Sequence, residues 1–129
     1  MRVALANIRF PKSPHESVSL AVDAVAKAGV EGAAIVCFPE AYVPGYRRKS
    51  VPAPPPDAAF LERAWERVAA AAAKASVAVI LGTERVVDGD LLISALVIDR
   101  DGKRLGWQDK VQLDPSEDGL YVAARSTAR

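Results

Sequence analysis

The sequence has 129 residues, 50% of them hydrophobic and 26% charged, and its formal net charge is +1. This length and composition suit one ordinary globular domain, and so small a charge gives no electrostatic reason to expect binding to nucleic acid or an anionic membrane. No apolar stretch approaches the roughly 20 residues of a membrane span, and the N-terminus lacks a signal-peptide pattern, so we expect a cytoplasmic protein.

The first half of the chain alternates between strand and helix patterns. Residues 2–8 predict a strand, and a capping box with proline at the first helical position predicts a helix from Ser13 to Gly29 or Gly32. The continuous apolar run 33–38 is typical of a strand covered on both faces. Residues 43–56 hold five of the nine prolines, so this segment is predicted to be a loop.

The second half begins with another helix, which Asp57 can cap. Strands are predicted over 77–81, 91–98 and 104–108, the last two joined by a tight turn at Asp101-Gly102. The order β-α-β-α-β-β-β indicates an α/β protein with a mixed sheet and two helices on one face. No further helix or strand is predicted after residue 108, and about 122–129 is expected to be an irregular tail.

Three charged residues follow predicted strands or lie just beyond them: Glu40, Lys110 and Glu117. The carboxyl ends of strands that feed helices line the functional crevice of α/β proteins, so Glu40 is placed where a general base could act. Aromatic neighbours, namely Phe38, Tyr42 and Tyr46, are expected to desolvate it partly. A lysine in the same crevice could hold a developing oxyanion.

Each of these residues also has an ordinary structural interpretation. Glu40 could face solvent at the start of a loop, Lys110 could extend to water at a strand end, and Glu117 could be a turn residue. The basic run 47–49 is interpreted as a solvated loop.

Considered together, the motifs point to a specific family. Phe38-Pro39-Glu40 followed by Pro44-Gly45-Tyr46 resembles the first catalytic block of the nitrilase, or carbon–nitrogen hydrolase, superfamily. Residues 107–113, with Lys110 a few residues before a leucine, resemble the second block, and the Asp101-Gly102 hairpin fits the one that precedes this lysine. Residues 114–117 resemble the continuation found in one bacterial branch. This resemblance covers nearly the whole chain.

The resemblance implies a Glu–Lys–Cys hydrolase of non-peptide C–N bonds in small amides, carbamoyl compounds or nitriles. Glu40 would be the general base, Lys110 would stabilise the tetrahedral intermediate, Glu117 would be the second glutamate that positions substrate, and Tyr46 would bind substrate. The implied fold is part of a four-layer αββα sandwich. The family needs no cofactor, and most of its members form homo-oligomers.

The resemblance lacks one component, the nucleophile. The family's cysteine follows the lysine block, whereas no cysteine follows Lys110 here. Cys37 lies in the same strand as Glu40 and is expected to be a buried, unreactive thiol that points away from it. Residues 1–129 are therefore expected to form an incomplete domain, inactive alone and missing a C-terminal half. His15 is the only histidine, and no metal site is expected.

Two alternatives remain open. The chain could be a non-catalytic fragment, or a half-domain that binds a partner through an exposed apolar sheet face. It could also be a generic α/β ligand-binding domain whose motifs match by accident. In that case Glu40 and Lys110 should point to different faces.

Overall fold

Two β-α-β units begin the chain, and two hairpins complete its sheet. The computed structural model describes residues 1–125. The elements are β1 (Val3–Leu5), α1 (Pro14–Val30), β2 (Ile35–Cys37), α2 (Ala58–Ala75), β3 (Ala78–Val87), β4 (Asp90–Ile98), β5 (Arg104–Asp109) and the 3₁₀ helix η1 (Pro115–Glu117).

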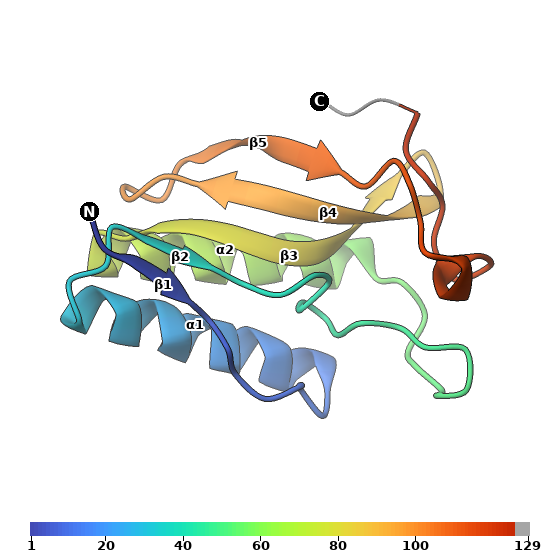
Figure 1. Ribbon diagram of the computed structural model, residues 1–129, viewed down its shortest axis with the longest axis horizontal. Coiled ribbons are helices and arrows are strands. Elements are labelled where there is room, and N and C mark those ends of the chain that lie inside the picture. Colours follow the sequence, from blue (N-terminus) through green and yellow to red (C-terminus); the bar gives the residue numbers. More distant parts are fainter. Residues whose placement is uncertain (126–129) are drawn as a thin grey trace.

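The sheet follows the chain order β1-β2-β3-β4-β5. Strands β1, β2 and β3 are parallel, and β4 and β5 add antiparallel hairpins. Because parallel strands are joined by right-handed crossovers and both crossovers proceed in the same direction, α1 and α2 lie side by side on one face (Figure 1). The predicted mixed sheet with two helices on one face is confirmed.

The helices begin where the sequence predicted. Ser13 Oγ accepts a hydrogen bond from Glu16 N, and Asp57 accepts one from Phe60 N, so both N-caps form. The predicted capping box of α1 is only half formed, since the Glu16 carboxylate accepts from Lys12 N and from Arg9 rather than from Ser13. Helix α1 ends at Val30, and Gly32 follows with a positive φ.

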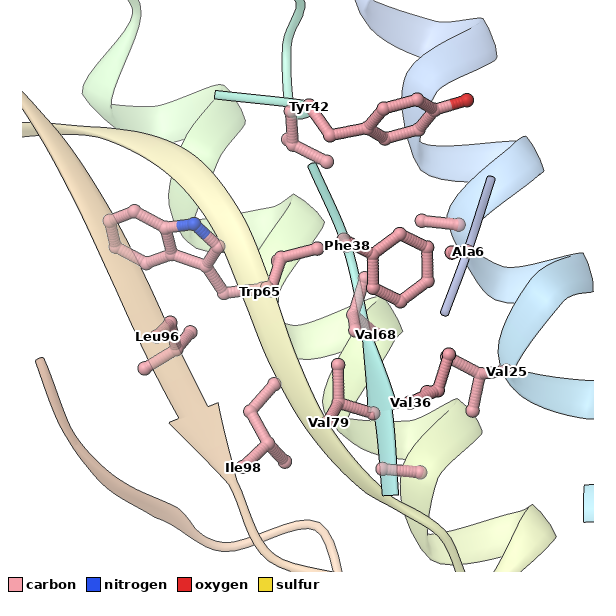
Figure 2. Packing of buried hydrophobic residues seen from close by; sticks show 14 of the residues in the cluster. Ala6, Val25, Val36, Phe38, Tyr42, Trp65, Val68, Val79, Leu96 and Ile98 are labelled. Carbon is pink, nitrogen blue, oxygen red and sulfur yellow. The ribbon is translucent and has the colours of Figure 1, made fainter. Parts of the chain in front are cut away.

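The hydrophobic core lies between the sheet and the two helices (Figure 2). Helices α1 and α2 contribute Val25, Trp65 and Val68 to it. The sheet contributes Val36 from β2, Val79 from β3, and Leu96 and Ile98 from β4, and Phe38 joins them just after the end of β2. The alternation along β2 therefore places Val36 toward the helices and Cys37 toward the opposite face.

The predicted ends of two strands were wrong. The first strand covers only Val3–Leu5, because Ala6 is the last residue to bond to β2 and the chain then turns at Asn7. Strand β3 continues to Val87, well beyond the predicted end, because β4 pairs with its whole length. The turn that permits this pairing is Asp88-Gly89, both with positive φ, as a two-residue hairpin turn requires.

Within residues 1–125, the face of the sheet away from the helices, here called the open face, is covered at one end only. There Leu91 and Ile93 pack with Tyr121 from the C-terminal segment. Elsewhere the open face exposes apolar side chains, of which Leu5 is 77% and Val3 49% exposed. The predicted irregular tail falls partly within the described residues, where Val122 and Ala124 donate backbone hydrogen bonds to Leu91 and Lys110. Residues 126–129 of that tail lie outside the described residues.

Candidate active site

Glu40 is brought onto the open face by a bulge of the chain beside β3. Phe38 N donates to Ile80 O and Val43 N donates to Gly82 O, and the residues between Phe38 and Val43 stand out from the sheet. A Cβ atom on Gly82 would lie 1.8 Å from the carbonyl oxygen of Pro39, so only glycine lets the Pro39–Glu40 backbone lie against this strand. The neighbouring Thr83 points the other way and accepts a hydrogen bond from Trp65 Nε1 of α2. Pro39 and Glu40 therefore lie on the face opposite to the helices.

Two of the three aromatic neighbours expected around Glu40 lie elsewhere. Phe38 and Tyr42 belong to the core on the helix side, and Tyr42 donates its hydroxyl to Arg9 O. Because the chain turns at Pro39 and at Ala41, whose φ is +48°, Glu40 does not follow the strand alternation that would have placed it beside Phe38. Its side chain is 42% exposed, and an approaching group can reach it from solvent.

Lys110 follows directly after β5 and is held by its backbone on both sides. Its N–H donates to Ile93 O of β4, and its carbonyl accepts from Ala124 N of the C-terminal segment. The preceding residue, Asp109, is buried and accepts hydrogen bonds from Arg85 and Ser94. These contacts fix the point from which the lysine side chain extends.

Glu117 is the most enclosed of the three predicted residues. It ends η1, whose capping box is complete, and its residue exposure is 1%. Its Oε1 accepts from Asp114 N at 2.9 Å, and its Oε2 accepts from the Tyr46 hydroxyl at 2.6 Å. The predicted turn-rich segment thus contains an ordered single turn with its glutamate directed inward.

The Lys110 ammonium lies between the two carboxylates. Its Nζ donates to Glu40 Oε1 at 2.6 Å, and it is 3.0 and 3.3 Å from the two oxygens of Glu117. Glu40 and Lys110 are 70 residues apart in sequence, and the segments that carry them meet at one end of the sheet (Figure 1). The generic-domain alternative required them to point to different faces, and it was wrong.

The opposite charges of Lys110 and Glu117 each favour the ionised form of the other. Hydrogen bonding to Glu40, and then to Glu117, raises the pKa of Lys110 above its ordinary value despite its partial burial. Burial alone would raise the pKa of Glu117, but its hydrogen bonds from Tyr46, Asp114 and Lys110 outweigh burial and lower that pKa. At neutral pH the cluster therefore holds a cationic lysine and an anionic Glu117.

Tyr46 lies in this cluster but faces Glu117. Its ring stacks on Tyr121 with centroids 6.2 Å apart, and its hydroxyl donates to Glu117. That hydrogen bond, followed by burial, raises the pKa of Tyr46. The contact that the structure shows for Tyr46 is with a glutamate of the cluster; a contact with substrate stays a prediction.

Cys37 is partly buried rather than fully buried, which corrects that prediction. Its partners in the sheet are Leu5 and Ile80, both apolar. Among the described residues, no group of three or more His, Cys, Asp or Glu side chains could hold a metal ion. In that same part of the chain, no helix has the length and apolar character needed to cross a membrane.

Two ion pairs with buried carboxylates were not predicted, and they lie on opposite faces of the sheet, since Arg85 lies over Trp107, which packs on Trp65 of α2. Arg85 pairs with Asp109 next to Lys110, and Arg47 pairs with Glu84 next to Tyr46. Arg47 had been interpreted as part of a solvated basic loop, but only its neighbours Arg48 and Lys49 are exposed. The alternating pattern of β3 does contain the charged dipeptide Glu84-Arg85, and charges within an otherwise apolar strand could have indicated such pairs.

Comparisons with known proteins find solved structures of similar fold. The chain is similar to the crystal structure of an amidase from Nesterenkonia sp., with 26% identity and a TM-score of 0.81. It is also similar to a mutant of that amidase in complex with butyramide, at 28% identity and a TM-score of 0.83. A third similar structure, at 25% identity and a TM-score of 0.81, is a mutant with the product of Michael addition of acrylamide at its active-site cysteine.

The chain corresponds to only part of these relatives. Each similar structure covers 98% of this chain, whereas the chain covers 49% of the first two and 50% of the third. Among curated proteins, no sequence matches it. The sequence model of the family described as carbon-nitrogen hydrolase matches residues 2–127. A match over nearly the full length shows that the chain belongs to the carbon–nitrogen hydrolase family.

Proposed function

We propose that this chain provides the glutamate and lysine part of an active site that hydrolyses small amides. The observation that carries the proposal is the Lys110 ammonium, 2.6 Å from Glu40 and 3.0 Å from Glu117. A fixed cation beside an accessible carboxylate suits a reaction that needs a base and a site for a developing oxyanion. The amidase relatives support amides as the substrate class.

The proposed reaction proceeds by covalent catalysis. A thiol contributed from outside these residues transfers its proton to Glu40 and attacks the amide carbonyl carbon, and Lys110 stabilises the resulting oxyanion. The tetrahedral intermediate collapses as the C–N bond breaks, and Glu40 returns the proton to the departing ammonia. Water then gives a proton to Glu40 and attacks the thioester; the C–S bond breaks, the acid is released, and Glu40 returns the proton to the departing thiolate. Glu117 holds Lys110 in place throughout.

The test measures ammonia release from acetamide, butyramide and acrylamide by the chain alone, by an extended form and by variants of that extended form. The 129-residue chain alone is expected to release none above the blank, because Cys37 is flanked by Leu5 and Ile80. A form extended by a cysteine-bearing second half is expected to be active. In that form Glu40→Gln and Lys110→Met should each lower kcat strongly, and Cys37→Ala should not. Activity of the short chain, or full activity of Lys110→Met, would overturn the proposal.

A non-catalytic role is a second candidate, favoured by the open face. Leu5 and Val3 leave apolar surface exposed where no helix covers the sheet. If the chain acts as a half-domain that binds a partner, it should associate through this face. Sedimentation of the wild type and of a Leu5→Lys variant would show this as an association that the lysine abolishes.

A further inference from the structure

Among the buried groups that take no part in the proposed reaction is Glu84, whose carboxylate is costly to bury in its ionised form. It lies in β3 on the open-face side with its side chain 0% exposed, and burial raises its pKa even though Arg47 opposes that effect. An ionised carboxylate in such a place needs a well-formed partner. Arg47 provides it, since its Nε and Nη2 both donate to Glu84.

Arg47 connects this carboxylate to the loop that carries Tyr46. The Nη1 atom of Arg47 donates to Pro54 O at 2.7 Å, and its backbone N–H donates to the Tyr121 hydroxyl at 2.9 Å. The loop is also joined to β3 before Tyr46, because Glu84 N donates to Val43 O at 2.9 Å. Tyr46 is therefore held from both sides, by Val43 and by Arg47.

Tyr46 transmits this restraint to the candidate active site. Its hydroxyl donates to Glu117 Oε2 at 2.6 Å, and the other oxygen of Glu117 is the nearer one to Lys110. We propose that Glu84 and Arg47 are positioning residues, which fix Tyr46 so that its hydroxyl holds Glu117 against Lys110. The catalytic meaning of this inference rests on the proposed function, but the side-chain geometry can be tested without any activity.

The test is a carboxyl ¹³C NMR titration of Glu117 in the 129-residue chain. In the wild type its pKa should lie below the ordinary value. Tyr46→Phe should raise it, because the hydroxyl donor is lost. Glu84→Gln should raise it too, although Glu84 does not contact Glu117. The double variant should match Tyr46→Phe alone, because Glu84 acts through Tyr46.

Leu81→Ala is the matched control for loss of stability. Leu81 lies in the same strand, is fully buried on the helix side, and its truncation leaves a cavity without touching the polar contacts. This variant should lower the unfolding temperature and leave the Glu117 titration unchanged. A purely structural role for Glu84 would instead make Glu84→Gln behave like Leu81→Ala, which would overturn the proposal.

Two further outcomes keep the inference testable. If Glu84→Gln does not fold, Arg47→Lys is the second variant. Lysine retains a cation but cannot form both contacts to Glu84 together with the contact to Pro54. Arg47→Lys should therefore also raise the pKa of Glu117. An unchanged titration in Arg47→Lys, or additive shifts in the double variant, would contradict the proposal. Neither result would affect amide hydrolysis by Glu40 and Lys110, so the two proposals can fail independently.

Discussion

Glu117→Gln is the substitution that examines the cluster most directly, because it keeps the size of the side chain and removes its charge. Both carboxylate oxygens face donors: Oε1 faces Asp114 N and Lys110, and Oε2 faces the Tyr46 hydroxyl and, at the longer distance of 3.3 Å, Lys110. The glutamine amide must therefore direct its NH₂ group at one of them. Only the Tyr46 hydroxyl can rotate to accept, so we expect the NH₂ group at that position.

The expected cost follows from these contacts. A hydrogen bond to a charged group contributes about 1.5–3 kcal/mol and a neutral one about 0.5–1.5 kcal/mol, so each of the donors loses roughly 1 kcal/mol. The loss at Lys110 is smaller, because its side chain is 29% exposed and retains Glu40 as a partner. We expect the free energy of unfolding to fall by about 2 kcal/mol at pH 7. For a chain of this size that lowers the unfolding temperature by roughly 8 °C.

The difference between wild type and Glu117→Gln should depend on pH. The pKa of Glu117 is lowered in the folded protein from its ordinary value of 4.5. Its carboxylate therefore contributes stability that is complete above that value and is lost as the pH falls through the folded pKa. Below that pH the protonated glutamate resembles glutamine, and the two proteins should become equally stable.

Urea unfolding of both proteins between pH 7 and pH 2 measures this. The control is Glu62→Gln, which breaks the exposed pair with Arg104 and should change stability by less than about 0.5 kcal/mol. The reasoning would be refuted by a difference at pH 7 no larger than that of the control. A difference that stays constant down to pH 2 would equally show that the charge of Glu117 is not what stabilises the cluster.

Three other predictions concern the same region. Lys110→Met leaves the buried Glu117 without its cation and should lower the free energy of unfolding by about 2 kcal/mol at pH 7. Glu40→Gln should lower it by less than about 1 kcal/mol, because Glu40 is exposed. Equal effects of the two substitutions in urea unfolding would contradict this prediction. The pKa values of Lys110 and Tyr46 are raised in the folded protein from 10.5 and 10.0. The contribution of these two groups to the free energy of unfolding is therefore complete below those values and is lost as the pH rises through the folded pKa values. Stability should fall above pH 10, and Tyr46→Phe should flatten that fall. Gly82→Ala places a Cβ atom against Pro39 O and should lower the free energy of unfolding by about 3 kcal/mol. The Cβ atom of Gly89→Ala meets no neighbour, so this variant should lose only about 1 kcal/mol, because of the positive φ. Similar unfolding temperatures for the two variants would contradict this prediction.

Much of the fold could be predicted from local patterns. The N-caps Ser13 and Asp57 and the Asp101-Gly102 turn lie where the sequence predicted, because caps and turns depend on a few adjacent residues. The end of β3 could not be placed in this way. Its apolar run is interrupted by Thr83, Glu84 and Arg85, and it continues as a strand because β4 pairs with it.

The sequence by itself determined the family and the three charged positions, because short motifs around Glu40, Lys110 and Glu117 are properties of adjacent residues. The tertiary structure alone decided what those residues contact. The Pro39–Glu40 segment lies on Gly82, the C-terminal segment carries Glu117 back over the open face, and the Arg47–Glu84 pair fixes the loop before α2. Arg47 and Glu84 are 37 positions apart and Glu40 and Lys110 are 70 positions apart, so no local preference encodes these contacts. The contacts of Glu84 and Glu117 form because a buried carboxylate is stable in its ionised form only where donors from other segments surround it.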